Sequence, residues 1–347
     1  MPDSAQLADG RCAAGISLQA YRPALLQPLV DFWNSEFANR RNFFPITPEL
    51  FRQRVVGKNY PEEPFDPAGL ILALDAADGK QAVVGMVHCG LRSEGFCRAV
   101  YPDQPTGGEA YIALIAVARR HRRKGIGKAL WDAATAYVAS KSEAVRLVID
   151  SQCLNLFYGN SDGLYAPLWG STEGIGIAWE DYATRKFLSK RGYEPQSKAI
   201  SLELPLATFR PFSSGAEKSL AERGLEIQWI DGRRPRLGGP PSDTLVSGQG
   251  AACGSVCCLH QGRVVAVISS YPMVELQRDK AAIYDFETMQ EYRGLGIGKA
   301  ILWEMLIQLR NRGAVTCEVL TIPHLSPHAH VLYRQAGFRP VAEWAVY

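Results

Sequence analysis

A basic, glycine-rich turn occurs twice in this chain of 347 residues. The first copy reads RRHRRKGIGKAL over residues 119–130, and the second reads EYRGLGIGKAIL over residues 291–302. When the shared GIGKA letters are aligned, Arg122 lies over Arg293, and the two copies are about half of the chain apart. Such a long period, occurring once, indicates duplication of a whole domain, because solenoid proteins repeat much shorter units many times.

The hydrophobic patterns around the two turns predict a similar order of elements in each half. In the first half we expect two helices at 25–42 and 47–56, a hairpin at 69–91 and a strand at 110–118. The turn at 119–127 follows, and then a helix at 128–142 and a strand at 144–150. In the second half we expect a strand at 225–230, a hairpin at 255–271 and a strand at 282–289. The turn at 291–298 follows, and then a helix at 299–313 and a strand at 315–322. The loop-like sequence between Asp231 and Gly250 predicts that the second domain lacks the helix pair of the first.

The polar stretch 210–224 suits a linker that holds one short helix, so we expect an N-terminal domain at 1–211 and a C-terminal domain at 212–347. An insertion at 155–180 is rich in Gly, Tyr and Trp. A loop of this length is commonly functional, and its aromatic content predicts a wall of an acceptor site.

Composition excludes several classes of protein. The chain is 47% hydrophobic and 21% charged, as in a globular protein with room for two cores, and a net charge of +3 is too small for a nucleic-acid-binding protein. No signal-like start and no apolar run of about 18 residues occur, so we expect a cytoplasmic protein that makes no membrane contact. The eight cysteines are scattered, and no carboxylate stands beside His324, His328 and His330, so we expect no metal site.

The turn has the chemistry of a phosphate cradle. A helix start exposes unpaired backbone N–H groups and the positive end of the helix dipole, and glycines let an anion approach that backbone. A Walker loop is excluded, because Lys128 and Lys299 are followed by Ala129 and Ala300 where that loop needs Ser or Thr. A dinucleotide-binding loop is excluded as well, since the third glycine is missing and several strands precede each turn.

The remaining pattern, R-x-x-G-x-G between a strand and a helix, resembles the GNAT superfamily of acetyl-CoA-dependent N-acetyltransferases. The late segment HVLYRQAGF at 330–338 resembles the last helix of that family, and KFLSKRGY at 186–193 resembles the same helix in the first half. The resemblance implies two domains of mixed α+β class. In each, a mostly antiparallel, twisted sheet would be splayed between its fourth and fifth strands and flanked by helices.

The resemblance also implies where acetyl-CoA binds as co-substrate. Its pyrophosphate would lie on the two turns, and its thioester carbonyl would be held by the strand backbone near Val117 and Thr288. The residues expected to contact it in the turns are Arg122, Arg123, Lys124, Gly125, Ile126, Gly127, Lys128, Arg293, Gly294, Leu295, Gly296, Ile297, Gly298 and Lys299.

The family's acid is commonly the tyrosine of the late helix, and the resemblance assigns this role to Tyr333. The equivalent position of the first half is Leu188, which cannot donate a proton, unless Tyr158 or Tyr165 of the insertion replaces it. For the general base we consider Glu287 and Asp285. Glu109 is the first-half analogue.

We therefore expect an N-acetyltransferase that transfers an acetyl group to a primary amine by direct attack in a ternary complex. The C-terminal domain is the favoured catalytic one, and a small-molecule amine is favoured over a protein as acceptor. Two alternatives stay open: catalysis in the N-terminal domain, and a non-catalytic acyl-CoA-binding module or sensor. Thiol release separates them, because a sensor binds acetyl-CoA without turnover.

Overall fold

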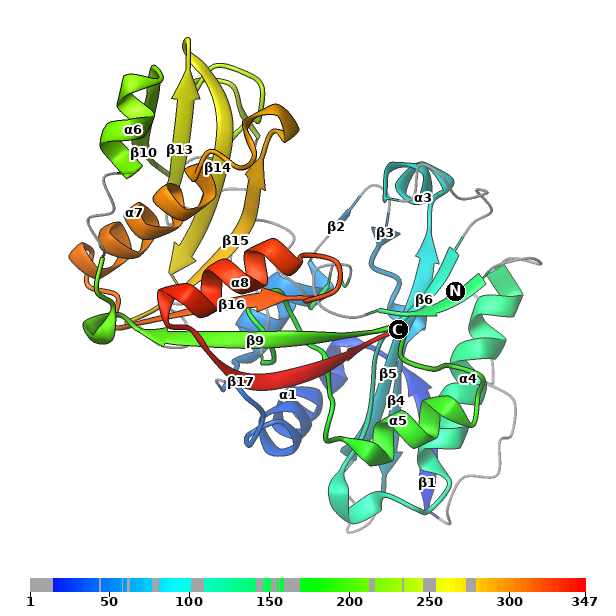
Figure 1. Cartoon of the computed structure of the whole chain (residues 1–347). Coiled ribbons are helices and arrows are strands. Elements are labelled where there is room, and N and C mark those ends of the chain that lie inside the picture. The colour runs from blue at the N-terminus through cyan, green and yellow to red at the C-terminus, as the bar shows by residue number, and fades with distance from the viewer. Residues whose placement is uncertain are drawn as a thin grey trace. The chain divides into compact units, whose positions relative to one another are not determined.

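The structure is a computed structural model that describes residues 15–43, 45–57, 59–60, 63–76, 81–100, 109–141, 146–150, 155, 157–158, 169–211, 216–232, 234–245, 254–272 and 279–347. The chain forms two compact units, an N-terminal unit at 1–158 and a C-terminal unit at 159–347 (Figure 1). Among the helices described, none is both long and apolar enough to cross a membrane.

The N-terminal unit contains a five-stranded sheet in the order β1-β4-β5-β6-β7, in which only β6 and β7 run parallel. Its strands are β1 (Ile16–Ala20), β4 (Leu70–Asp75), β5 (Ala82–Arg92), β6 (Glu109–Val117) and β7 (Arg146–Ile149), beside a small pair β2 (Asn59–Tyr60) and β3 (Glu63–Pro64). Its helices are α1 (Leu26–Glu36), α2 (Pro48–Phe51), α3 (Glu94–Val100) and α4 (Ile126–Lys141).

The helix pair expected before the first hairpin is confirmed as α1 and α2. The Thr47 hydroxyl accepts a hydrogen bond of 3.1 Å from the Leu50 N–H, and Pro48 occupies the first turn, so α2 begins where the sequence predicts. The helix continues as a π-helical turn over Arg52–Val56. The ring of Phe51 packs 5.6 Å from that of Trp33 in α1, which joins the two helices through buried aromatic contact.

The C-terminal unit contains an eight-stranded sheet in the order β10-β13-β14-β15-β16-β9-β17-β8. These strands are β8 (Ile177–Ala178), β9 (Ser197–Pro205), β10 (Leu225–Asp231), β13 (Gly254–His260), β14 (Arg263–Pro272), β15 (Lys280–Thr288), β16 (Thr316–Thr321) and β17 (Arg339–Val346). Its helices are α5 (Tyr182–Ser189), α6 (Ala216–Glu222), α7 (Ile297–Asn311) and α8 (Pro327–Ala336).

The second half lacks the helix pair, as the sequence predicts. Between β10 and β13 the described residues form only the two-stranded pair β11 (Arg234–Pro235) and β12 (Thr244–Leu245) and no helix. The short helix expected in the linker is α6. The expected α+β class, with two mostly antiparallel sheets flanked by helices, is confirmed.

Strand β9 lies between β16 and β17 in the sheet of the C-terminal unit. Its inward residues Leu202 and Leu204 are buried in that unit's main core, and both of its edges are paired, so its backbone groups are satisfied there. The segment 159–211 thus packs with the second unit. The domain boundary that we expect after residue 211 follows the sequence repeat. The two compact units instead meet between residues 158 and 159, before this segment.

Both sheets splay between their fourth and fifth strands. Strand β6 pairs with β7 only from Glu109 to Ile112, and then continues alone on that side to Val117. Strand β15 likewise pairs with β16 only from Lys280 to Ile283, and then continues to Thr288. Each sheet therefore has the V-shaped opening that the resemblance implies, with unpaired backbone groups along one wall.

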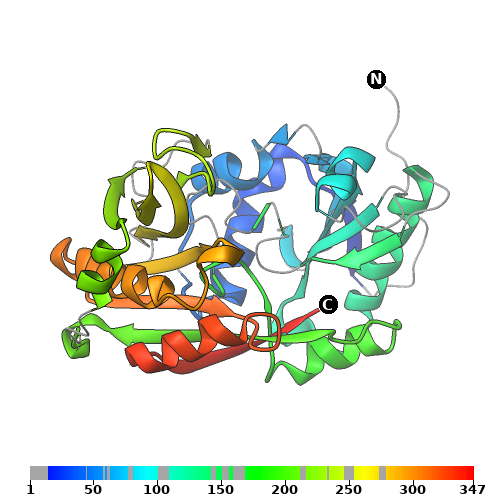
Figure 2. The same ribbon diagram turned by 45° about the horizontal axis from the view of Figure 1, so that its top comes forward.

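Helices α7 and α8 cover one face of the C-terminal sheet (Figures 1 and 2). Residues of both helices belong to one core cluster, which includes Ile297, Leu306, Tyr333 and Phe338. The late helix is thereby fixed beside the unpaired half of β15. This places Tyr333 next to the opening.

Candidate active site

The two basic turns have the same backbone conformation. In the first, Arg123 and Gly125 adopt left-handed φ values of 66° and 84°, and α4 begins directly afterwards. In the second, Gly294 and Gly296 adopt φ values of 81° and 82° before α7. The glycine pattern shared by the two turns thus reflects a shared backbone shape, which L-residues other than glycine adopt only at a cost.

Open space surrounds these glycines. A Cβ atom added to Gly125, Gly294 or Gly296 would meet no heavy atom within 4 Å. The absence of a side chain there therefore leaves the backbone N–H groups at each helix start accessible. Such a site suits an anion of the size of a phosphate group.

The leading arginine of each turn closes the turn in the same way. The Nε–H of Arg122 donates a hydrogen bond of 2.9 Å to the carbonyl of Val117, and the Nε–H of Arg293 donates one of 3.1 Å to the carbonyl of Thr288. Each arginine thereby links the turn to the end of the preceding strand. The Val117 and Thr288 carbonyls, expected near a thioester, are occupied by these contacts.

The two turns differ in how their positive charge is neutralised. In the first turn, Arg122 forms an ion pair with the largely buried Glu36, which also accepts a 3.0 Å hydrogen bond from the Arg119 N–H. Lys128 forms an ion pair of 2.5 Å with Asp132. In the second turn, Arg293 has no carboxylate partner among the described residues, so its charge is available to an incoming anion.

Tyr333 lies in α8 beside the unpaired half of β15. Its side chain is 4% exposed, and its ring centroid lies 6.0 Å from that of Phe286 in β15 and 5.6 Å from that of Phe338. Burial raises the pKa of the Tyr333 phenol above its usual range, and the neighbouring Glu173 and Cys317 add to this effect. The phenol is therefore protonated at neutral pH.

The two acidic residues expected as a general base share an arginine. Arg234 contacts Asp285 at 3.0 Å and Glu287 at 3.3 Å. Asp285 sits in a bulge of β15 with a left-handed φ of 51°. Burial raises the pKa of Asp285, Arg234 opposes this, and Glu287 reinforces it. Both carboxylates therefore face a fixed cation, which an amine would have to displace.

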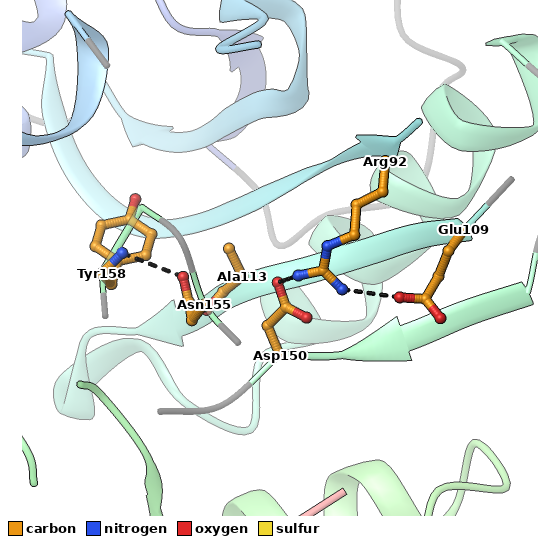
Figure 3. Close-up of polar contacts among 6 residues, drawn as sticks. All are labelled: Arg92, Glu109, Ala113, Asp150, Asn155 and Tyr158. Carbon is orange, nitrogen blue, oxygen red and sulfur yellow. Dashed lines mark hydrogen bonds and ion pairs between the residues drawn. The ribbon is translucent and has the colours of Figure 1, made fainter. Parts of the chain in front are cut away.

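Two buried side chains, Asn155 and Tyr158, lie beside β6 at the opening of the N-terminal sheet (Figure 3). The Asn155 side chain donates a hydrogen bond of 2.6 Å to the carbonyl of Ala113, which is the extra residue of a bulge in β6. Asn155 also accepts a 3.2 Å hydrogen bond from the Tyr158 N–H. Both residues are fully buried, so they occupy the space beside the unpaired backbone of β6.

The alternative proton donors of the first half are poorly placed or fall outside the described residues. The Tyr158 hydroxyl lies 3.1 Å from Nδ1 of the buried His88, and its ring stacks on Trp33 at 5.5 Å. Burial raises the pKa of the Tyr158 phenol above its usual range. Tyr165 lies outside the described residues. Leu188 is buried in α5, where it serves packing.

Glu109 belongs to a buried cluster at the closed end of the first opening (Figure 3). Arg92 contacts Glu109 at 2.8 Å and Asp150 at 2.5 Å, and so ties together β5, β6 and the end of β7. In the C-terminal unit, Lys280 contacts Glu318 at 2.6 Å and Glu203 at 3.0 Å. These clusters hold the fourth and fifth strands together where they pair. Glu109 therefore has a partner that suits a structural role.

Sequence reasoning missed one acidic residue, Glu173. The described part of the insertion forms a tight turn from Ser171 to Gly174, and the Tyr271 hydroxyl donates a hydrogen bond to the Thr172 carbonyl. Glu173 belongs to this turn, and its charge adds to the raised pKa of the Tyr333 phenol. A single Glu in an irregular, glycine-rich segment carries no periodic signal, so the sequence does not single it out.

The sequence matches the profile of the acetyltransferase (GNAT) family over residues 33–156 and 224–338, which together exceed half of the chain. No match was found among curated proteins. The described residues contain no group of three or more His, Cys, Asp or Glu side chains that could hold a metal ion.

Three solved structures resemble the chain in fold. A GCN5-related glucosamine N-acetyltransferase region in a fungal multi-domain GH3 β-N-acetylglucosaminidase has a TM-score of 0.63 and 16% identity, over 97% of this chain and only 38% of the fungal one. A GCN5-related N-acetyltransferase from Sphaerobacter thermophilus has a TM-score of 0.59 and 14% identity, over 96% and 95% of the two chains. A tandem GNAT protein from the clavulanic acid biosynthesis pathway has a TM-score of 0.57 and 14% identity, over 95% and 97%.

At these identities the three structures show likeness of fold alone. The family match does not depend on these structures. It covers one region in each half of the chain, and each region contains a basic turn and the fourth strand of a sheet. The chain therefore belongs to the GNAT family of N-acetyltransferases, as a tandem protein with two copies of the family's fold.

Proposed function

We propose that the protein transfers an acetyl group from acetyl-CoA to a primary amine, and that the C-terminal unit performs the reaction. The observation that carries this proposal is the buried, protonated Tyr333 beside the unpaired half of β15, below a basic turn whose arginine has no carboxylate partner among the described residues. The helix that the sequence repeat makes equivalent to α8 is α5, which belongs to the C-terminal unit and carries Leu188 in place of a tyrosine.

The residues of the second turn fit a CoA pyrophosphate. Backbone N–H groups at the start of the 15-residue α7 supply donors and a positive dipole end. Gly294 and Gly296 leave the approach open, and Arg293 and Lys299 supply positive charge. The unpaired backbone of β15 beyond Ile283 supplies donors and acceptors for the pantetheine arm.

Bound acetyl-CoA would supply the thioester whose carbonyl carbon the amine attacks. Tyr333 donates its hydroxyl proton to the sulfur as the C–S bond breaks, so the leaving group departs as a thiol. The tyrosine then regains a proton from solvent. One proton leaves the acceptor nitrogen and one reaches the sulfur, so the reaction is balanced without a metal ion.

We infer that the N-terminal turn binds acetyl-CoA more weakly. Arg122 is already paired with Glu36, and Lys128 with Asp132. The Asn155 side chain already donates a hydrogen bond to the carbonyl of Ala113. An incoming pantetheine arm must displace that buried hydrogen bond. Leaving a buried polar group unsatisfied costs about 1–3 kcal/mol, which is on the order of a 10- to 100-fold loss of affinity.

Catalysis in the N-terminal unit is the second candidate, because its helix pair α1 and α2 is intact. Its proton donor would be Tyr158, whose hydroxyl is buried against His88. A non-catalytic acyl-CoA sensor is the third candidate. The acceptor class is a small amine in our proposal, and glucosamine is among the probes because the fungal structural neighbour is named for it.

An acceptor screen that follows release of the CoA thiol tests the proposal. Spermidine, glucosamine, lysine and n-butylamine are offered at saturating concentration, and acetyl-CoA binding is measured by calorimetry in parallel. We expect turnover with at least one amine, and two binding events of unequal affinity. Acetyl-CoA binding without thiol release for any of the four amines would identify a sensor instead.

A further inference from the structure

A cavity of about 560 Å³ lies in the C-terminal unit, between the end of α6, the start of β10 and the middle of α7. Figure 1 shows these three elements beside one another. Protein cavities of about 300–1,000 Å³ are of the size that binds small molecules. The cavity is therefore large enough for a ligand of its own.

The cavity is separate from the opening between β15 and β16. Strand β10 is the first strand of the sheet, and β13 and β14 lie between it and β15. Neighbouring strands are about 4.8 Å apart, so β10 lies roughly 14 Å from β15 across the sheet. A molecule in the cavity would therefore leave the proposed acetyl-CoA site free.

One part of the cavity wall is apolar. Leu220 and Leu225 are 2% and 5% exposed and belong to the main core of the unit, and Ile227 packs against that core. The link between α6 and β10 is Gly224, where an added Cβ would meet only the ring of His260, at 3.9 Å. The core thus holds an apolar surface in place, and the link adds no side chain that would fill the space beside it.

The charged groups of the wall are both acidic. They are Glu226 and Glu304, and no Lys or Arg is among the described lining residues. Glu304 is half-buried and accepts a hydrogen bond of 2.7 Å from the Gln308 side chain, but neither acid has an ion-pair partner among the described residues. Partial burial of a carboxylate without a cation is unfavourable. A bound cation would remove this cost.

The acid in α7 is specific to the second half. When the two basic turns are aligned, Glu304 lies over Ala133 of α4. The first half therefore has no carboxylate at the matching position of its helix, although it has the same turn. This difference separates Glu304 from the features that the two copies share.

We propose that the cavity binds an organic cation, a primary ammonium group on an apolar body. The ammonium group pairs with Glu226 and Glu304, and the hydrocarbon part covers Leu220, Leu225 and Ile227. The two negative charges disfavour carboxylates and phosphates as ligands. A bare metal ion fits less well, because two carboxylates supply few of the six to eight oxygen ligands that Ca²⁺ takes. This inference does not depend on which unit performs the reaction.

The test compares three six-carbon compounds that differ in charge: n-hexylammonium, 1-hexanol and hexanoate. Methyl NMR of the full chain reports where each one binds, through the signals of Leu220, Leu225 and Ile227. We expect n-hexylammonium to shift these signals and to bind about tenfold more tightly than 1-hexanol, since each ion pair with a partly exposed carboxylate contributes about threefold. Hexanoate should bind most weakly of the three.

Matched variants identify the groups that select the cation. Glu226→Gln and Glu304→Gln should each weaken n-hexylammonium binding about threefold, and the double variant should bind it no better than 1-hexanol. Glu222→Gln, which changes an exposed acid of α6 outside the cavity wall, should have no effect. Ala221→Trp fills the cavity and should block 1-hexanol as well. Melting temperatures check that all four single variants fold.

Two results would overturn the proposal. One is n-hexylammonium binding that is no tighter than that of 1-hexanol, because the carboxylates then select no cation. The other is n-hexylammonium binding that leaves the three methyl signals unchanged or persists at full strength in the folded double variant, because the binding site then lies elsewhere. Absence of thiol release in the acceptor screen would bear on the proposed function alone, since this test follows binding.

Discussion

Replacing Tyr333 by Phe removes one hydroxyl and leaves the packing in place. The ring contacts with Phe286 and Phe338, at 6.0 and 5.6 Å, are available to a phenylalanine as well. The lost group is a phenol that burial keeps protonated. The substitution therefore changes the proton available to the leaving sulfur, and little else.

The expected loss is large in kcat and small in binding. A positioned general acid contributes about 10²- to 10⁴-fold, or roughly 3–5 kcal/mol of transition-state stabilisation. Steady-state thiol release with the best amine of the screen measures kcat, and calorimetry measures acetyl-CoA affinity. We expect kcat to fall by that factor and the affinity to stay within about twofold, since the hydroxyl acts only in the transition state.

A matched control is available in α5. Leu188 stands where the sequence repeat places the counterpart of Tyr333, and Leu188→Phe introduces the same ring without affecting the proposed acid. Turnover should survive in that variant if it folds. A Tyr333→Phe protein with near-normal kcat would refute the assignment of the acid, and a parallel fall in acetyl-CoA affinity would point to a binding role instead.

Three further predictions concern stability. Leu188→Ala should lower the free energy of unfolding by about 2–5 kcal/mol with no specific loss of kcat, because the side chain is only 1% exposed; equal stability in denaturant would contradict the packing role. Arg92→Met should lower the free energy of unfolding by about 3–5 kcal/mol, because it leaves Glu109 and Asp150 buried without their cation; unchanged stability in denaturant would argue against this cause. Burial lowers the pKa of His88 from 6.5 to about 3, so its neutral form stabilises the fold above pH 6.5 and this contribution falls by up to about 1.4 kcal/mol per unit as the pH drops toward 3; His88→Gln should flatten that part of the stability curve.

The turns could be predicted from the sequence because local chemistry determines them. A basic residue, two glycines and a helix start specify one backbone conformation, and the two copies adopt it with φ values at Gly125 and Gly296 that differ by only a few degrees. The periodic patterns likewise predicted the helix pair of the first half and its absence from the second. These features depend on residues that are neighbours in the sequence.

The contacts made across long sequence distances could not be predicted. Arg234 lies in a loop-like stretch, and nothing in that stretch indicates that it pairs with Asp285 and Glu287 in β15. Strand β9 has the alternation of any half-buried strand, which does not specify the neighbour with which it pairs. The Tyr271 hydroxyl binds the Thr172 carbonyl, 99 residues away in the sequence. Such contacts follow from tertiary structure.

A pair of matched turn variants tests the central claim, that the C-terminal unit carries the chemistry. Gly125 and Gly296 have φ values of 84° and 82°, and a Cβ at either meets no heavy atom within 4 Å, so Gly125→Asp and Gly296→Asp impose the same small strain and the same repulsion of a phosphate. The decisive measurement is kcat/KM for acetyl-CoA by thiol release in the two folded variants. We predict that Gly296→Asp is inactive and that Gly125→Asp keeps most of the wild-type value. An active Gly296→Asp beside an inactive Gly125→Asp would place catalysis in the N-terminal unit and contradict the account.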